Sequence, residues 1–366
     1  MGDPVQLLSM ANEQITILQN DALALLRQLI ATPSFSKEED NTADILEQFL
    51  ERKGVRTRVH LKNIWATNKF FEENKPTILL NSHHDTVRPN KGYTMDPFSP
   101  VEVDGKLFGL GSNDAGGCLV SLIAAFLYYY NKADLKYNLM LAATAEEEIS
   151  GSNGVESLLP HLGKIDCAIV GEPTEMQMAV AERGLMVLDC TAHGRAGHAA
   201  RNEGENAIYK AIHDIEWFCS YEFPKVSELL GPVKMNITVI DTENKAHNVV
   251  PSECKFVVDV RVNELYSFED VMQTIKSNVT SEIRARSFRL RSSSIALDHP
   301  LVKSGLTLGR SYYGSPTTSD KALMPFPALK MGPGDSARSH TANEYIYIDE
   351  IKNGIELYIQ LLDRIV

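Results

Sequence analysis

The chain has 366 residues, of which 43% are hydrophobic and 23% charged, and its formal net charge is −12 at pH 7. This length favours two domains, and the balanced composition argues against disorder. The acidic excess argues against a nucleic-acid partner, because phosphate binding depends on clustered Lys and Arg. The longest nearly apolar stretch, residues 118–130, is too short to cross a bilayer, so no membrane partner is expected. The five cysteines lack CxxC spacing, which is typical of reduced thiols in a cytoplasmic protein.

Helical and strand patterns alternate through the first half of the chain. Apolar residues recur at helical spacing over 20–31 and 41–53, and residues 118–130 are typical of a buried helix. Short apolar runs that indicate buried strands occupy 77–80, 138–142 and 167–170. Buried strands with helices between them predict a three-layer α/β domain with a mostly parallel central sheet.

The middle of the chain has a different pattern. Strands are expected at 185–191, 233–239, 256–262 and near 288–291, and helices at 206–218 and 268–283. The order β-α-β-β-α-β predicts a ferredoxin-like α+β unit inserted as a block. The first pattern then returns, with a strand at 328–331 and a closing helix at 348–365. We therefore expect an inserted domain at 181–292 and a catalytic domain formed by 1–180 and 293–366.

Side chains suited to metal binding follow the strands of the expected catalytic domain. His83, His84 and Asp85 come after one strand, residues 146–148 are all Glu, and Glu172 follows a third strand. The last strand leads toward His340, and Asp114 precedes the buried helix. Ligands of open α/β sheets bind outside the carboxyl ends of the strands, so these groups are expected to meet at one edge.

Each of these motifs is weak alone, since HxD triplets arise by chance and an acidic triple is usually a solvated loop. Together, two imidazoles with three or four carboxylates and no thiol suit divalent zinc or cobalt. A carboxylate shared by two ions would make a two-metal site, able to activate water and polarise a carbonyl. Ser336 with Asp335 and His340 is not read as a catalytic triad, because the segment has no nucleophile elbow.

These motifs resemble the acetylornithine deacetylase and succinyl-diaminopimelate desuccinylase family of two-metal aminoacylases and carboxypeptidases. The resemblance runs from about residue 25 to the C-terminus and rests on five segments in the family's order: 83–87, 109–114, 144–148, 171–174 and His340. It implies a zinc-peptidase-like catalytic domain and an inserted lid or dimerisation domain.

The resemblance also implies a role for each metal-site residue. Asp114 would bridge two divalent ions, with zinc favoured over cobalt, and Glu147 would be the general base. Asp85 would hydrogen-bond the His83 imidazole and fix its tautomer. The peptide bond after Asp114 is expected to be cis. The remaining ligands would be His83 and Glu172 on one ion and Glu148 and His340 on the other.

Residues of the inserted domain are assigned by the same resemblance. His198 would stabilise the oxyanion across a dimer interface, which implies a homodimer. Asn248 and Arg261 would hold a substrate carboxylate, since Arg offers bidentate geometry. Arg183 and Thr318 are further candidates for substrate binding. Arg261 could equally be a solvated strand residue.

The sequence departs from the family pattern after the bridging residue. The family often has Asp-x-Lys-Gly-Gly, whereas residues 114–118 are Asp-Ala-Gly-Gly-Cys and contain no Lys. No ligand is lost, but the pocket is changed. Two registers are also open: strand alternation directs only one of His83 and His84 into the crevice, and the phase of the Glu triple follows the family through Thr144.

The expected activity is removal of the acyl group from an N-acyl amino acid, and acetylornithine-like deacetylation in arginine biosynthesis is the leading hypothesis. The alternatives are an N-succinyl amino acid such as succinyl-diaminopimelate, an acylated citrulline, and di-, tri- or carboxypeptidase activity, because peptide and N-acyl bonds are both amides. A non-catalytic metal-binding protein is a competing class. The presence of Glu147 argues against it, since a binding site alone has no need of a proton shuttle.

Overall fold

The structure is a computed structural model that describes residues 4–201 and 203–366, and its internal contacts divide the chain into two units. The first unit comprises residues up to Val180, Ile295–Tyr313 and Ser319–Val366. The second comprises Ala181–Ser294 and Gly314–Thr318. The first unit is thus discontinuous, as in the predicted organisation. The return of residues 314–318 to the second unit is a feature that the sequence did not predict. No described helix combines the length and the apolar character that crossing a membrane requires.

The centre of the first unit is a set of parallel strands. The strands lie in the order β1-β2-β6-β3-β7-β17-β8, and the pairs β6–β3, β3–β7 and β7–β17 are parallel. Antiparallel pairs flank this centre, at β1–β2, β2–β6 and β17–β8. The mostly parallel sheet that the sequence predicts is therefore confirmed. The strands are β1 (Arg58–His60), β2 (Asn63–Thr67), β3 (Thr77–His83), β6 (Asn138–Thr144), β7 (Cys167–Val170), β8 (Met178–Glu182) and β17 (Ala328–Lys330).

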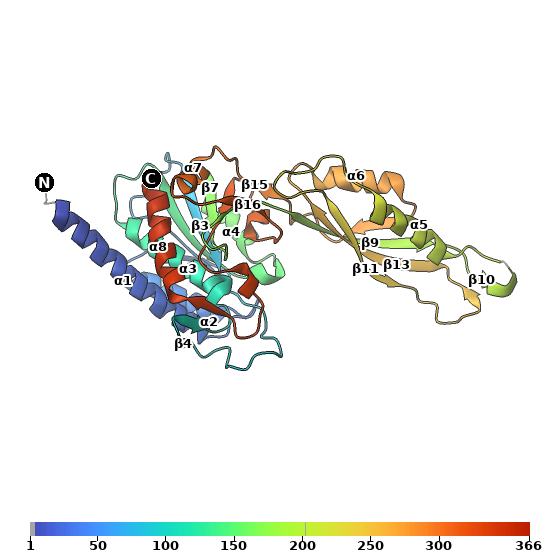
Figure 1. Cartoon of the computed structure of the whole chain (residues 1–366), viewed down its shortest axis with the longest axis horizontal. Coiled ribbons are helices and arrows are strands. Elements are labelled where there is room, and N and C mark those ends of the chain that lie inside the picture. The colour runs from blue at the N-terminus through green and yellow to red at the C-terminus, as the bar shows by residue number, and fades with distance from the viewer. Residues whose placement is uncertain (1–3, 202) are drawn as a thin grey trace. The chain divides into compact units, whose positions relative to one another are not determined.

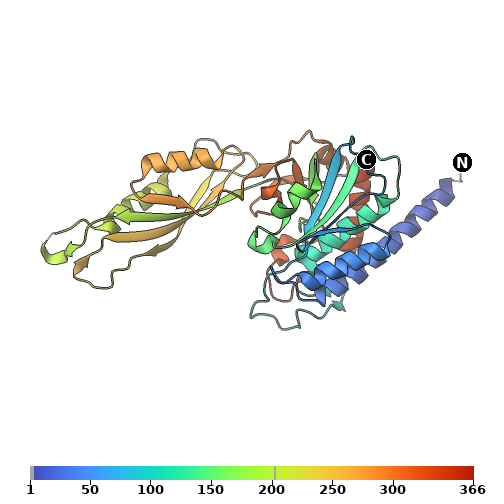
Figure 2. The ribbon, with the colours of Figure 1, turned by 180° about the vertical axis from the view of Figure 1, so that it is seen from behind.

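The sheet is covered on both faces, which explains why its central strands are buried along their whole length. On one face, α4 (Val155–Leu162) packs Val155 and Leu158 against Leu79 and Met140. On the other, α3 (Gly117–Tyr130) contacts β3 and β6 and packs between α1 (Pro4–Ile30) and α8 (Ile348–Asp363). These three layers can be followed in Figure 1 and from behind in Figure 2.

The remaining elements of the first unit lie around this sandwich. α2 (Asp40–Arg52) packs against α1 and β2, and α7 (Pro300–Thr307) packs against α8. A separate three-stranded sheet has the order β18-β5-β4 and pairs the C-terminal part of the chain with residues that precede α3. Its strands are β4 (Val101–Val103), β5 (Lys106–Phe108) and β18 (Tyr345–Tyr347).

The second unit has the predicted β-α-β-β-α-β order. Its sheet is arranged β11-β13-β9-β14 with antiparallel pairs, and Figure 1 shows both helices on one face of it. Buried residues alternate along β9 and β13 because only that face is covered. A two-stranded ribbon of β10 (Gly197–His198) and β12 (Val249–Val250) is attached to this sheet. The main elements are β9 (Gly184–His193), α5 (Ala207–Ser220), β11 (Lys234–Asp241), β13 (Glu253–Val262), α6 (Phe268–Asn278) and β14 (Glu282–Ala285).

The predicted end of this unit is wrong in detail. The helix expected over 268–283 ends at Asn278, and the strand is Glu282–Ala285 rather than a segment near 288–291. Ile283 continues the apolar helical spacing, but in the structure it pairs with Cys190 of β9. Sheet pairing with a distant strand therefore outweighed the local helical pattern, as is common at element boundaries.

Candidate metal centre

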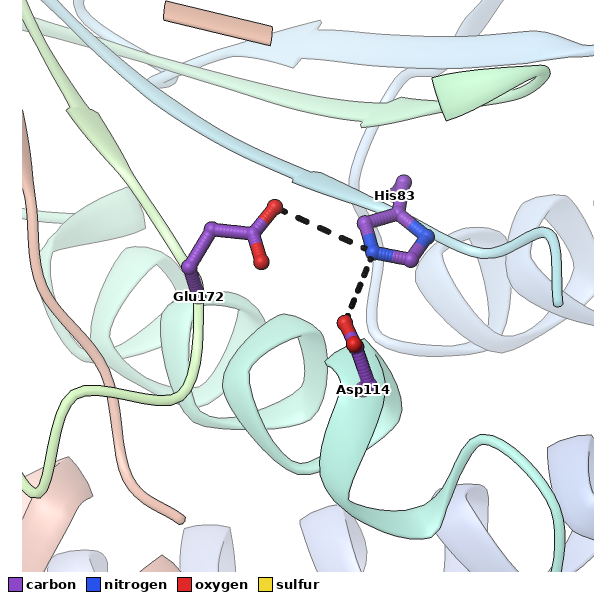
Figure 3. A group of neighbouring side chains, drawn as sticks. All are labelled: His83, Asp114 and Glu172. Atoms are coloured by element: carbon purple, nitrogen blue, oxygen red, sulfur yellow. Dashed lines mark hydrogen bonds and ion pairs between the residues drawn. The ribbon is translucent and has the colours of Figure 1, made fainter. Parts of the chain in front are cut away.

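Parallel strand register brings the first group of polar side chains together. His83 is the last residue of β3, and Asn81 pairs with Val170 of β7, so His83 and Glu172 each lie two residues beyond paired positions. Asp114 lies in the turn η1 (Ser112–Gly116), directly before α3. Figure 3 shows the three side chains converging from these separate elements.

The His83 imidazole has one nitrogen fixed and the other directed at carboxylates. Its Nδ1 lies 2.9 Å from the backbone carbonyl oxygen of Asp85, so Nδ1–H donates to that oxygen. Its Nε2 lies 3.3 Å from Oδ1 of Asp114 and 3.8 Å from Oε1 of Glu172. The nitrogen that faces the carboxylates is therefore the unprotonated one in the neutral ring, as a metal ligand requires.

A second group shares Asp114 with the first. Nε2 of His340 lies 2.9 Å from Oε2 of Glu148 and 3.8 Å from Oδ2 of Asp114. The two Asp114 oxygens thus face different groups, with Oδ1 toward His83 and Oδ2 toward His340. Potential ligand atoms within each group lie within 4.8 Å of one another. The structure brings together all five sequence-predicted ligands, and Asp114 has the position of a bridge.

Asp85 connects the first group to the Glu triple. Its carboxylate is 3.4 Å from Nδ1 of His83, farther than its own backbone oxygen. The same carboxylate accepts hydrogen bonds from the backbone N–H groups of Glu147 at 3.0 Å and Glu148 at 3.2 Å, and from the Ser36 hydroxyl at 2.7 Å. Asp85 therefore holds the turn that carries Glu147 as well as orienting His83.

The structure assigns a different environment to each member of the Glu triple. The Glu146 carboxylate accepts from the side-chain amide of Asn153 at 2.9 Å, away from the two groups. Glu148 contacts His340, and the electrostatic neighbours of Glu147 include Glu172 and His83. The register set by Thr144 thus directs Glu147 and Glu148, and not Glu146, toward the centre.

His84 points away from the centre, which answers the ambiguity between the two adjacent histidines. Its Nε2–H donates to the backbone oxygen of Lys62 at 2.9 Å, and its Nδ1 lies 2.9 Å from the Thr42 hydroxyl. Burial lowers the pKa of His84 to about 4. This histidine is a neutral, fully bonded core residue.

The electrostatics of the centre show a surplus of buried negative charge. Burial raises the pKa of Glu147 well above its usual range, and the neighbouring Glu172 adds to the rise. Burial would lower the pKa of His83, but hydrogen bonds to Asp114 and Asp85 outweigh it and the pKa is raised well above normal. The hydrogen bond to Glu148 is the main reason that the pKa of His340 rises to about 9. A divalent cation bound by these groups would displace the protons that they retain.

This donor set fits divalent cations. Each group offers one imidazole nitrogen and carboxylate oxygens, without a thiolate, and one carboxylate is common to both. Nitrogen and oxygen ligands of this kind suit zinc and other borderline divalent metals. The peptide bond between Asp114 and Ala115 is cis, as the family resemblance predicts.

The absence of Lys after Asp114 has a local structural explanation. A Cβ placed on Gly116 would lie 2.5 Å from the backbone oxygen of Gly111 and 2.7 Å from the Leu26 side chain. The backbone of this loop therefore leaves no room for a side chain at position 116. The departure from the family pattern is built into the way the Asp114 turn packs against α1.

Three of the predicted substrate residues lie near one another in the second unit. The Arg183 guanidinium donates to the backbone oxygen of Leu230, and burial followed by the nearby Arg261 charge lowers the pKa of Arg183. The Thr318 hydroxyl donates to the backbone oxygen of Arg183 at 3.2 Å. Arg261 forms a two-point contact with Asp259, with nitrogen–oxygen distances of 2.8 and 3.1 Å. Arg261 is thus neither purely solvated nor unpaired.

The other two predicted residues lie at the opposite end of the same unit. His198 pairs with Val249 in the β10–β12 ribbon, beside Asn248, whose backbone oxygen accepts from Ala199. Arg261 is at the far end of β13 from this ribbon, and eight residues of strand span about 26 Å. Figure 1 shows β10 well beyond the end of β13. Asn248 and Arg261 of one chain therefore lie too far apart to contact the same carboxylate group.

Two buried carboxylates at the centre were not predicted. Asp320 accepts from the Asn81 amide at 3.0 Å and from the Thr144 hydroxyl at 2.8 Å, and burial raises its pKa to about 6. Glu344, which is 2% exposed, accepts from backbone N–H groups of the Asp114 turn. Neither belongs to a motif used in the sequence analysis. The closeness of Glu344 to His340 in the chain is the one signal that could have identified it.

Comparisons with known proteins agree with this architecture. A family profile described as peptidase family M20/M25/M40 matches residues 79–364. A peptidase M20 domain-containing protein of Schizosaccharomyces pombe is 28% identical and is covered over 88% of its length by 98% of this chain. A succinyl-diaminopimelate desuccinylase of Wolbachia pipientis is 26% identical, with 93% of this chain and 92% of that protein covered. The YXEP protein of Bacillus subtilis, a dinuclear metal binding M20 peptidase, superposes with a TM-score of 0.73 at 15% identity, covering 95% of this chain and 98% of that one.

Proposed function

Because the chain belongs to peptidase family M20/M25/M40, we propose that it is a two-metal hydrolase that cleaves the amide bond of an N-acyl amino acid. The single observation that carries this proposal is the position of Asp114, whose two oxygens face two separate His–carboxylate groups. The description of the Bacillus subtilis neighbour as a dinuclear metal binding protein supports the same reading.

The ligand roles follow from the two groups. His83 and Glu172 would hold one ion and Glu148 and His340 the other, with Asp114 shared between them. Bound divalent ions would supply an acidified water and a polarised carbonyl. The hydrogen bond from Nδ1 of His83 to the Asp85 backbone keeps Nε2 directed at the ligand group.

Glu147 would move the proton in the proposed reaction. Asp85 fixes the Glu147 backbone, so the carboxylate is held beside the ligand groups without belonging to either of them. A buried carboxyl with a raised pKa accepts a proton from water more readily than an ordinary surface carboxylate does. The same group then gives that proton to the leaving nitrogen.

The substrate class is the finer part of the proposal. Relatives named succinyl-diaminopimelate desuccinylase favour an N-succinyl amino acid, the alternative raised from sequence, over the acetylornithine substrate that was the leading hypothesis. Arg183 and Arg261 lie close enough for their charges to interact. Arg261 is already bound to Asp259, so Arg183 is the better candidate of the two to bind a substrate carboxylate. An arginine-biosynthetic role therefore has less support than an N-succinyl amino-acid substrate.

A homodimer formed through the second unit belongs to the same proposal. β11 is an edge strand of its sheet, and Val239 and Ile240 on it are 52% and 54% exposed. On α5, Tyr209 is 72% exposed. An unpaired edge with exposed apolar residues is a common site of association. The backbone N–H of Ala200 donates to Nδ1 of His198, which leaves Nε2–H of this exposed ring free to donate to an oxyanion in a partner's site.

The test combines a substrate screen with a variant of the proposed base. We expect N-succinyl amino acids to be hydrolysed in the presence of Zn²⁺ or Co²⁺, with N-acetylornithine and dipeptides as competing substrates. Glu147→Gln should keep its metal but lose about 10²- to 10⁴-fold in kcat. Glu146→Gln is the matched control, since Glu146 bonds to Asn153 instead. Full activity in Glu147→Gln would exclude it as the base, and no hydrolysis of any amide by the metal-loaded protein would exclude the function.

A further inference from the structure

The Glu344 carboxylate occupies an unusual position behind the Asp114 turn. It is 2% exposed, and its Oε1 accepts hydrogen bonds from the backbone N–H groups of Asn113 at 2.8 Å and Asp114 at 2.9 Å. Its Oε2 accepts from the N–H of Gly111 at 3.0 Å. Within the described part of the chain, no Lys, Arg or His side chain forms an ion pair with it. The backbone of the turn is thus the main partner of this buried carboxyl group.

These hydrogen bonds fix the backbone that carries Asp114. The turn between Gly111 and Gly116 is irregular, with Gly111 at φ 75° and Asp114 at non-helical angles. The N–H groups of Ser112 and Gly116 donate to backbone oxygens, whereas those of Gly111, Asn113 and Asp114 donate to Glu344. The Glu344 carboxylate is thus the acceptor for three N–H groups of this turn. The side chain of Asn113 adds a further anchor, because it exchanges hydrogen bonds with the backbone of Asp335 at 3.0 and 3.1 Å.

The segment that carries Glu344 also carries His340, and it is itself fixed. His340 and Asn343 both have left-handed backbone angles, at φ 60° and 55°, which non-glycine residues rarely adopt. The side-chain Oδ1 of Asn343 accepts from the backbone N–H groups of Thr94 and Met95, each at 3.0 Å. One short segment therefore carries both His340, which lies near Oδ2 of Asp114, and Glu344, which accepts a hydrogen bond from the Asp114 backbone.

We propose that Glu344 is a positioning residue for the bridging Asp114: its three backbone hydrogen bonds set the orientation in which the two Asp114 oxygens face separate ions. The inference rests on the metal pair of the proposed function. Glu344 contributes no ligand atom to either group and contacts Asp114 through its backbone N–H, so it acts through the turn. Removing an outer partner of a metal ligand generally weakens metal binding by about 10- to 100-fold.

The test is metal binding to the chelator-treated protein, independent of any substrate. Co²⁺ is titrated into wild type and Glu344→Gln by calorimetry, and visible absorption of the bound Co²⁺ reports its ligand geometry. We expect Glu344→Gln to bind Co²⁺ at least about tenfold more weakly and with an altered spectrum. Glu344→Asp keeps the carboxyl group but withdraws it by one methylene, and an intermediate affinity is expected. The shorter variant also serves if Glu344→Gln does not fold.

Asp214→Asn is the matched control for general destabilisation. Asp214 is likewise buried and accepts from backbone N–H groups, those of Thr280 and Ser281, but it lies in the second unit. Its variant should bind Co²⁺ as wild type does. Wild-type affinity and spectrum in folded Glu344→Gln or Glu344→Asp, or an equal loss in Asp214→Asn, would overturn the inference while leaving the metal pair intact. Wild-type protein that binds no Co²⁺ would overturn both.

Discussion

Replacing Asp85 by Asn tests whether the Asp85 carboxylate holds the turn that carries Glu147. Oδ1 accepts from the Glu147 backbone, and Oδ2 accepts from the Glu148 backbone and the Ser36 hydroxyl. Asn keeps one oxygen, so whichever way the amide is oriented one backbone N–H faces an NH₂ group. A buried donor left without an acceptor costs about 1–3 kcal/mol. If that cost falls on the placement of Glu147 in the transition state, kcat/KM decreases about 5- to 150-fold.

Steady-state kinetics at saturating Co²⁺, with bound metal measured per chain, is the appropriate assay for Asp85→Asn. Asp166→Asn is the control, because Asp166 accepts from the backbone N–H of Thr77 at 2.9 Å, at the other end of β3. We expect Asp166→Asn to affect stability but not kcat/KM. A folded, metal-loaded Asp85→Asn with wild-type kcat/KM, or an equal loss in both variants, would show that Asp85 does not position the turn.

Two further predictions concern the protein without metal and the Asp114 turn. The fold raises the pKa of His340 from its usual 6.5 to about 9, so the stability from its protonated form is full below pH 6.5 and is lost as the pH rises through 9. The raised pKa of Glu147 acts in the same direction. The thermal unfolding midpoint of chelator-treated protein should therefore fall as the pH rises from 6.5 to 9, and bound Co²⁺ should reduce this fall. A midpoint that rises over this pH range would contradict the prediction. In Gly116→Ala the new Cβ meets the Gly111 oxygen, and a loss of about 1–3 kcal/mol in unfolding free energy with weaker Co²⁺ binding is expected. Wild-type thermal and Co²⁺-binding curves for Gly116→Ala would mean that the turn can relax.

Much of the fold could be predicted because its central strands are buried on both faces. Such strands are continuous apolar runs, and the polar residues that follow them, such as His83 and Glu172, are then placed at one edge by parallel register. The β-α-β-β-α-β order of the second unit could also be predicted, because apolar and polar residues alternate in strands such as β13. The separation of Arg261 from Asn248 follows from the length of β13, which sets the distance between the two ends of the unit.

Features that depend on distant contacts could not be read from local patterns. The end of α6 is set by the pairing of Ile283 with β9, which no helical periodicity reports. Glu344 looks like an ordinary acidic residue until the Asp114 turn is placed beside it. In the same way, the sequence shows only that Gly116 replaces the Lys of the family pattern. The position of the Gly111 oxygen, which a side chain at 116 would meet, explains the replacement.

The position of β17 determines when the central sheet can be completed during synthesis. β17 lies between β7 and β8, so two strands from the first half of the chain are bridged by one that leaves the ribosome much later. An emerging chain that stops before residue 328 carries His83, Asp114, Glu148 and Glu172, but its sheet has a gap and the second imidazole is missing. The site is therefore complete only after β17 and His340 have been synthesised, and chains truncated before residue 328 should be metal-poor and aggregation-prone.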